Sequence, residues 1–257
     1  MNKIKTFSCG FCRQLEKLAS VKGKWRMRVF PAKCFLIRLT EGYMLFDAGY
    51  SADFNSVISG WPQVLYKYLI PVNIEPQDTC LSQLKKESIK AEEIKYIFIS
   101  HFHADHIGAL RDFPAARFIC SGKDYKKLKN LSTFRQLLKG FANKLLPEDF
   151  ESRVTYVEDL QEVTDKIFPV CYALPFAKDI FAVSLPGHTA GQFGLWFPQE
   201  NILLAADSAW AKENYTDNSP LHWFALRFCD DSKAFRKTLD LLKSLKNTKI
   251  LLSHGDE

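Results

Sequence analysis

Four short apolar segments of this chain are each followed directly, or within a few residues, by a histidine or an aspartate. No other feature constrains the fold more. The segments are 94–100, 180–185, 202–206 and 250–252, and the residues that follow them are His101, His188, Asp207 and His254. Short runs of large aliphatic residues are typical of buried β-strands. Because sheet scaffolds present functional side chains from the loops at strand ends, the pattern predicts a sheet protein with one polar site.

The rest of the chain predicts strands that alternate with helices. Further strands are expected at 25–30, 33–40, 43–47, 118–120 and 193–197, and helices at 78–88 with Asp78 as the cap, from about Asp105, at 128–150 and at 231–245. The last helix carries apolar residues at helical spacing on one face. No repeat or Gly/Ser/Pro-rich linker divides the sequence. We therefore expect an α/β protein with mixed sheets covered by helices, folded as a single domain over residues 1–257.

Composition excludes several function classes. The net charge is +6, and the basic residues are scattered, so nucleic-acid binding is not expected. No stretch approaches the ~20 apolar residues that span a membrane. The basic N-terminus is not followed by a signal-type apolar run, because Arg13, Glu16 and Lys17 interrupt it, and we expect a cytoplasmic protein.

The cysteines are odd in number and dispersed. There are seven, which favours reduced thiols over a disulfide framework. Cys9 and Cys12 have the spacing of a redox pair but no βαβ setting around them. We interpret them as two buried thiols.

The segment from Ser100 to His106 carries the chemistry. Side chains at positions i, i+2 and i+4 of an extended chain share one side, so His101, His103 and Asp105 converge if the strand continues past Ser100. His106 would then point toward a second centre. Imidazole nitrogen and carboxylate oxygen are ligands of zinc, and four of them are too many for one catalytic ion with an open position. The segment predicts two ions; iron or manganese stay open beside zinc.

The spacing His-X-His-X-Asp-His, followed by three distant ligands, resembles the metallo-β-lactamase superfamily. Asp47-Ala48-Gly49 resembles its early aspartate motif, and the matching landmarks run from about residue 43 to residue 254. The resemblance implies a four-layer αβ/βα sandwich of two mixed sheets with helices on the outer faces. It also implies a site at one edge, between two similar halves.

The resemblance also implies a role for each candidate ligand. His101, His103 and His188 would bind one divalent ion; Asp105, His106 and His254 would bind the other; Asp207 would bridge the two; and Asp47 would support the ligand loop. Two cations about 3.5–4 Å apart can share a water and lower its pKa to roughly 7. We therefore expect a hydrolase that uses a metal-bridging hydroxide, with Asp207 or Asp105 passing a proton to the leaving group.

Within this superfamily the chain most resembles N-acyl-homoserine lactone lactonases and related hydrolases of small esters. Those lactonases have Tyr three residues after the bridging Asp, where this chain has Trp210; Tyr215 is an alternative, and His222 is a further candidate for substrate contact. Aromatic residues suited to an acyl chain are Trp61, Tyr66, Phe134, Phe141, Trp210, Trp223 and Phe224.

The expected substrate is a small ester or lactone that bears an acyl chain. A thioester hydrolase resembling hydroxyacylglutathione hydrolases, a phosphodiesterase and a catalytically idle metal-binding ligand sensor stay open as alternatives. The sequence does not indicate the oligomeric state.

Overall fold

The structure is a computed structural model that describes residues 4–217 and 219–255. The chain divides into two compact units, one with residues 4–13 and 31–155 and the other with residues 14–30 and 156–255. Each unit is built on a β-sheet with helices, so the predicted α/β class is confirmed. The single domain predicted over residues 1–257 stays a prediction. In the described ranges, none of the helices has the length and apolar character needed to cross a membrane.

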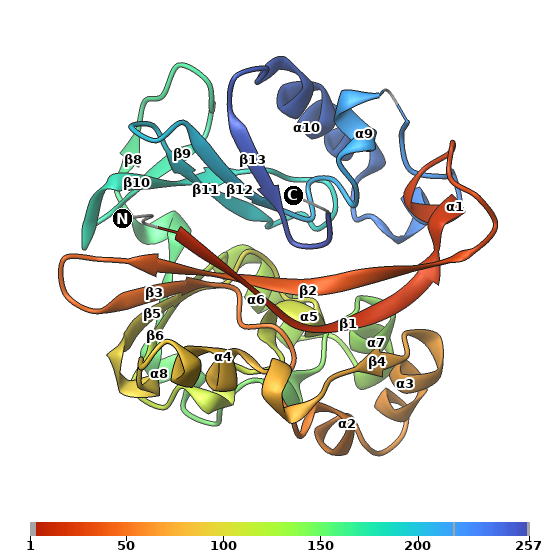
Figure 1. Cartoon of the computed structure of the whole chain (residues 1–257), viewed down its shortest axis with the longest axis horizontal. Coiled ribbons are helices and arrows are strands. Elements are labelled where there is room, and N and C mark those ends of the chain that lie inside the picture. Colours follow the sequence, from red (N-terminus) through yellow and green to blue (C-terminus); the bar gives the residue numbers. More distant parts are fainter. Residues whose placement is uncertain (1–3, 218, 256–257) are drawn as a thin grey trace. The chain divides into compact units, whose positions relative to one another are not determined.

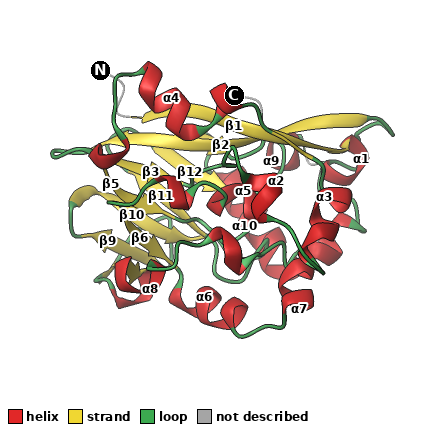
Figure 2. Ribbon diagram, turned by 90° about the horizontal axis from the view of Figure 1, so that it is seen from below, coloured by secondary structure: helices red, strands yellow, loops and turns green. Residues whose placement is uncertain are grey.

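The first unit contains a mixed sheet with the strand order β4-β1-β2-β3-β5-β6-β7. Its strands are β1 (Ile4–Leu15), β2 (Met27–Arg38), β3 (Tyr43–Phe46), β4 (Val72–Asn73), β5 (Ile94–Phe98), β6 (Arg117–Cys120) and β7 (Val154–Tyr156). The pairs β3–β5 and β5–β6 are parallel, whereas β2–β3 is antiparallel. In Figure 2, β1 and β2 run side by side as long strands. Since β3 and β5 are both internal and parallel, their carboxyl ends lie at the same edge of the sheet.

Short helices accompany this sheet. They are α2 (Phe54–Val57), α3 (Tyr66–Leu69), α4 (Cys80–Lys86), α5 (Ala104–Ile107), α6 (Gly122–Lys129), α7 (Thr133–Leu138) and α8 (Phe150–Arg153). Helix α4 lies against the sheet in Figures 1 and 2, and Gln83 Nε2 donates to the Ser8 carbonyl on β1 at 2.8 Å. Single 3₁₀ turns occupy Gln63–Leu65, Pro76–Asp78, Ala91–Glu93, Leu110–Asp112 and Asn143–Leu145.

The second unit contains a sheet with the order β13-β12-β11-β10-β9-β8. Its strands are β8 (Glu162–Val163), β9 (Cys171–Leu174), β10 (Ala177–Ser184), β11 (Phe193–Phe197), β12 (Ile202–Ala206) and β13 (Lys249–Leu252). Its helices are α1 (Glu16–Ala19), α9 (Glu213–Thr216) and α10 (Ser232–Ser244). Single 3₁₀ turns occupy Val157–Asp159 and Ala225–Phe228. β12 and β13 are parallel and the other pairs are antiparallel. Phe235, Leu239 and Leu242 of α10 share one core with Leu203 of β12 and Leu252 of β13. Figure 1 shows α10 beside β13.

Two predicted helices differ from the observed ones. The helix expected over 128–150 is wrong: the chain forms α6, α7 and α8 with irregular connections, because Gly140 takes a left-handed φ of 63° and ends the α7 segment. The helix expected from Asp78 begins at Cys80 instead. Thr79 is its N-cap, since Thr79 Oγ1 accepts from the Ser82 N–H at 3.1 Å.

Candidate metal site

The first group of predicted ligands lies on the loop that follows β5 and on α5. β5 ends at Phe98, so the expectation that an extended strand carries Asp105 onto the side of His101 and His103 is wrong. His103 instead has extended φ and ψ and is the N-cap residue of α5, whose first turn carries Asp105 and His106. The imidazole centroid of His101 lies 4.5 Å from that of His103 and 4.0 Å from that of His106. A tight loop-to-helix turn, not strand alternation, brings these rings together.

Asp47 anchors this loop from the neighbouring strand. It follows β3 with a left-handed φ of 60°, a conformation that a non-glycine residue adopts only when its surroundings hold it there. Its Oδ1 accepts from the Ser100 N–H at 2.8 Å, and its Oδ2 lies 2.7 Å from His106 Nδ1. Burial raises the pKa of Asp47, while the contacts with His106 and Ser100 lower it. An ionised Asp47 only accepts, so His106 Nδ1 donates and Nε2 keeps its lone pair for an ion.

Ser100 is a site residue that the sequence did not reveal. Its hydroxyl donates to Asp47 Oδ2 at 2.8 Å and lies 3.0 Å from His101 Nδ1. With its proton directed at Asp47, the oxygen accepts from His101 Nδ1–H, which leaves His101 Nε2 with its lone pair. The only sequence signal was position, since a serine directly before the His-rich segment is otherwise unremarkable.

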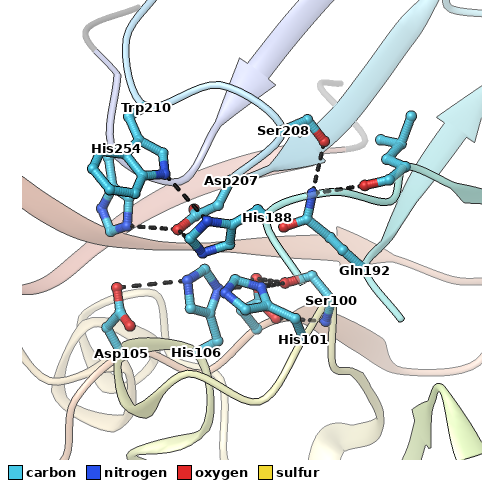
Figure 3. A network of polar contacts seen from close by, with 12 residues as sticks. Ser100, His101, Asp105, His106, His188, Gln192, Asp207, Ser208, Trp210 and His254 are labelled. Atoms are coloured by element: carbon cyan, nitrogen blue, oxygen red, sulfur yellow. Dashed lines mark hydrogen bonds and ion pairs between the residues drawn. The ribbon is translucent and has the colours of Figure 1, made fainter. Parts of the chain in front are cut away.

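The second group of predicted ligands gathers around Asp207 in the second unit. Asp207 directly follows β12, and Ala206 before it has a left-handed φ of 47° where the β12–β13 register shifts. Asp207 Oδ2 lies 3.3 Å from His188 Nε2 and 3.1 Å from His254 Nε2. Figure 3 shows both imidazoles directed at this carboxylate. One carboxylate oxygen of Asp207 therefore lies within 3.3 Å of two imidazole nitrogens.

Backbone and amide contacts hold the segments that carry His188 and Asp207 in place. Gly187 directly precedes His188 and has a φ of 132°. A Cβ at this position would lie only 2.2 Å from the Phe235 nitrogen of α10, so the backbone before His188 packs directly against that helix. The amide of Gln192 donates to Ser208 Oγ at 2.8 Å and to the Leu185 carbonyl at 3.1 Å (Figure 3). Gln192 and Ser208, which sequence reasoning missed, thus connect the loop before His188 to the residue after Asp207.

The three candidate substrate residues have different surroundings. The indole Nε1 of Trp210 donates to His188 Nδ1 at 3.3 Å, so its N–H contacts a ligand histidine (Figure 3). Tyr215 on α9 belongs to the buried core of the second unit, and burial raises its pKa. His222 stacks edge-on with Trp25 at 6.2 Å, and its Nδ1 accepts from the Phe224 N–H. Their roles toward a substrate stay predictions.

The donor chemistry fits divalent metal ions. Each group offers imidazole nitrogen together with carboxylate oxygen, the borderline ligands that zinc accepts and that iron and manganese also tolerate. His101, His106, His188 and Asp207 are buried, whereas His103, Asp105 and His254 are partly exposed. In the first group, Asp47 and Ser100 set the tautomers of His106 and His101 so that Nε2 of each can bind. Each group therefore combines buried candidate ligands with at least one partly exposed candidate ligand.

Comparison with known proteins identifies relatives of one kind. The sequence profile of the metallo-β-lactamase superfamily matches residues 27–254. An N-acyl homoserine lactonase of Bacillus cereus is 24% identical over 201 residues, which cover 76% of this chain and 70% of that protein. The N-acyl homoserine lactonase AttM of Azorhizobium caulinodans is 26% identical over 193 residues, which cover 74% and 69%.

Solved structures show the same fold. An N-acyl homoserine lactone hydrolase, solved with the product N-hexanoyl-L-homoserine bound at its catalytic metal centre, matches 99% of this chain and 93% of its own with a TM-score of 0.75 and 18% identity. At 18% identity, this similarity shows a shared fold, that is, the same arrangement of strands and helices.

Proposed function

This chain belongs to the metallo-β-lactamase superfamily, and from that premise we propose that it is a two-metal hydrolase that cleaves an ester or lactone bond of a small, acyl-chain-bearing substrate. The observation that carries the proposal is the environment of Asp207, whose Oδ2 faces both His188 Nε2 and His254 Nε2 within 3.3 Å. A carboxylate held between two imidazoles is suited to bridging two ions, and the curated relatives are named as lactonases.

We assign the ligands as the family pattern implies. One ion would be held by His101, His103 and His188, the other by Asp105, His106 and His254, with Asp207 shared between them. When bound, such a pair of ions polarises the scissile carbonyl and activates water at neutral pH.

The residues of the chain have distinct tasks in this scheme. Asp47 and Ser100 keep the protons of His106 and His101 on Nδ1, so that the Nε2 atom of each ring has a lone pair for an ion. Asp105, whose Oδ2 lies 3.5 Å from His106 Nε2 and whose side chain is partly exposed, can carry a proton to the leaving oxygen at that atom. Asp207 can do the same at its second oxygen, Oδ1.

An apolar surface beside the first ligand group supports an acyl-chain substrate. Helix α7 exposes Phe134 and Leu138 and leads directly into Gly140. A Cβ at Gly140 would lie 2.8 Å from His103 Cδ2, and the Gly140 carbonyl accepts from the Ala104 N–H at 3.0 Å. An apolar chain lying on α7 would therefore end next to His103. Of the other aromatic candidates, Tyr66 and Phe141 are buried in the core, and Trp61, Trp223 and Phe224 are exposed.

Zinc is the ion that we propose, since nitrogen and oxygen donors of this kind suit it best. We also propose a reducing compartment such as the cytosol, because all seven cysteines are thiols.

The decisive experiment joins metal analysis with a substrate panel. Purified protein should contain about two equivalents of zinc, iron or manganese per chain. It should hydrolyse acyl lactones and aryl esters, and excess chelator should abolish turnover. A folded protein that takes up no divalent metal, or turnover that resists the chelator, would contradict the proposal.

The same panel separates the alternatives. Preference for acyl thioesters would indicate the thioesterase, and preference for bis-aryl phosphates the phosphodiesterase. Metal content without turnover of any substrate, together with a thermal shift on adding an acyl lactone, would indicate the ligand sensor.

A further inference from the structure

Three cysteines from distant parts of the sequence meet inside the first unit. Cys9 lies on β1, Cys34 lies on β2, and Cys80 is the first residue of α4. All three side chains are fully buried. Their sulfur atoms lie within 4.8 Å of one another, and the Sγ atoms of Cys9 and Cys34 are 3.2 Å apart. Cys12, which has the redox spacing from Cys9, is a buried thiol as the sequence predicts but is not part of this cluster.

We propose that Cys9, Cys34 and Cys80 form a second metal site, separate from the histidine and aspartate ligands, that binds a single Cu(I) ion through three sulfurs. Three thiolates at about 2.3 Å from a central ion lie roughly 4 Å from one another. The sulfur atoms of Cys9 and Cys34 are 3.2 Å apart and no pair is separated by more than 4.8 Å, so small side-chain rotations would bring the three sulfurs to that spacing.

The donor set selects the ion. Thiolate is a soft ligand that favours Cu(I), zinc and iron–sulfur clusters over hard cations. Structural zinc takes four protein ligands, and the cluster found in the described residues comprises these three cysteines alone. Cu(I) is a closed-shell soft ion that accepts two or three thiolates. Three buried sulfurs therefore match Cu(I) better than zinc.

A side-chain amide also approaches the cluster. Gln83 Nε2 lies 3.7 Å from Cys9 Sγ and can donate an N–H to this sulfur when it binds an ion.

The cluster also contacts the chain that carries Asp47. Gly49 packs flat on Cys9: it has a φ of 72°, and a Cβ there would lie 2.2 Å from Cys9 Cβ. The Cys9 carbonyl accepts from the Tyr50 N–H at 3.1 Å. An ion at the cluster would therefore tie β1, β2 and α4 together directly behind the Asp47 loop.

The test is an anaerobic Cu(I) titration of the reduced, full-length protein, first loaded with zinc, against a chromophoric Cu(I) chelator. We expect about one Cu(I) per chain, a thiolate-to-Cu(I) charge-transfer band and a raised unfolding temperature. Cys80→Ser should lower the Cu(I) affinity at least ~10-fold, as expected for the loss of one strong ligand. Cys120→Ser, at a buried cysteine of the same unit outside the cluster, should retain it. Equal affinity in both variants would overturn the proposal.

X-ray absorption at the copper edge of the unsubstituted protein provides a check that needs no variant. Three sulfur neighbours at about 2.3 Å support the site. Nitrogen or oxygen neighbours, or the absence of retained copper, overturn it. Because the ion and the ligands differ from those of the hydrolase site, failure here leaves the hydrolase proposal standing, and a failed substrate panel leaves the copper site standing.

Discussion

His106 Nδ1 lies 2.7 Å from Asp47 Oδ2, with both side chains buried, and this contact determines which nitrogen of His106 carries the proton. Asp47→Asn replaces an acceptor by an amide that can present N–H to Nδ1 and favour the wrong tautomer. We expect zinc affinity to fall by about 10–100-fold. Competition with a zinc chelator measures it. Asp53→Asn, at an exposed carboxylate a few residues along the same segment, is the control; an equal loss in both variants would assign the effect to the segment and not to this contact.

Replacing the carboxylate shared by two imidazoles should remove metal and activity together. Asp207→Asn keeps the shape but loses the charge that faces His188 and His254. We expect the metal content to fall below two ions per chain and hydrolysis to fall by at least ~100-fold, which corresponds to about 2.7 kcal/mol of transition-state stabilisation. Asp240→Asn on the exposed side of α10 serves as the control. Full metal content with full activity in Asp207→Asn would contradict the assigned role of Asp207.

Trp210 should oppose metal binding at His188. Its indole donates to Nδ1 of His188, so the proton of that ring is on Nε2, the atom that faces Asp207. An ion at Nε2 requires the proton on Nδ1, and the indole must then turn away. Trp210→Phe removes a hydrogen bond worth about 1 kcal/mol and should raise zinc affinity about 5-fold. The exposed Trp223→Phe is the matched aromatic control; weaker zinc binding in Trp210→Phe would show that the indole supports the site.

Gly187 should tolerate no side chain. Its φ of 132° and the 2.2 Å separation that a Cβ would have from the Phe235 nitrogen combine backbone strain with a clash against helix α10. Gly187→Ala should lower the free energy of unfolding by about 3 kcal/mol, measured by urea denaturation. Gly60→Ala shares a positive φ of 82° but meets only Lys144 Nζ at 3.8 Å. Gly60→Ala should lower the free energy of unfolding by about 1 kcal/mol. Equal losses of stability in the two variants would show that backbone strain alone, and not the clash with α10, is responsible.

Asp112 should make the protein less stable as the pH rises. Burial, and then repulsion from Asp53, raise its pKa from 3.8 to about 6 in the folded state. The folded protein holds this proton more tightly than the unfolded chain, so stability is lost between about pH 4 and pH 6. Partial solvent screening reduces the effect to about 1 kcal/mol. Asp112→Asn should stabilise the chelated protein by that amount at pH 7.5 and not at pH 3.5; equal urea midpoints for the two proteins at both pH values would contradict it.

The strands that precede the candidate ligands could be predicted from local sequence, whereas β1, β4, β7, β8 and β9 were not predicted. The segments before His101, His188, Asp207 and His254 form β5, β10, β12 and β13, because short runs rich in large aliphatic residues and bounded by turn residues are typical of buried strands. Loops at strand ends are where sheet scaffolds place functional side chains, which is why each candidate ligand was expected there.

Local patterns failed where backbone conformation depends on distant contacts. The helix expected over 128–150 is broken because Gly140 packs against His103, some forty residues earlier in the chain. The geometry of Asp105 and His106 comes from a helical turn that β5 alternation does not predict.

The residue types, and the strands that precede the candidate ligands, were determined by the sequence itself: apolar segments, turn residues and a dense set of imidazoles and carboxylates. The tertiary structure alone decided which partners those side chains meet. Ser100 between Asp47 and His101, the indole of Trp210 on His188, and the meeting of Cys9, Cys34 and Cys80 all join residues whose contacts depend on how strands and helices pack. The physical reason is that burial and hydrophobic periodicity act over a few residues, whereas hydrogen-bond direction and ligand geometry depend on chain segments that only folding brings together.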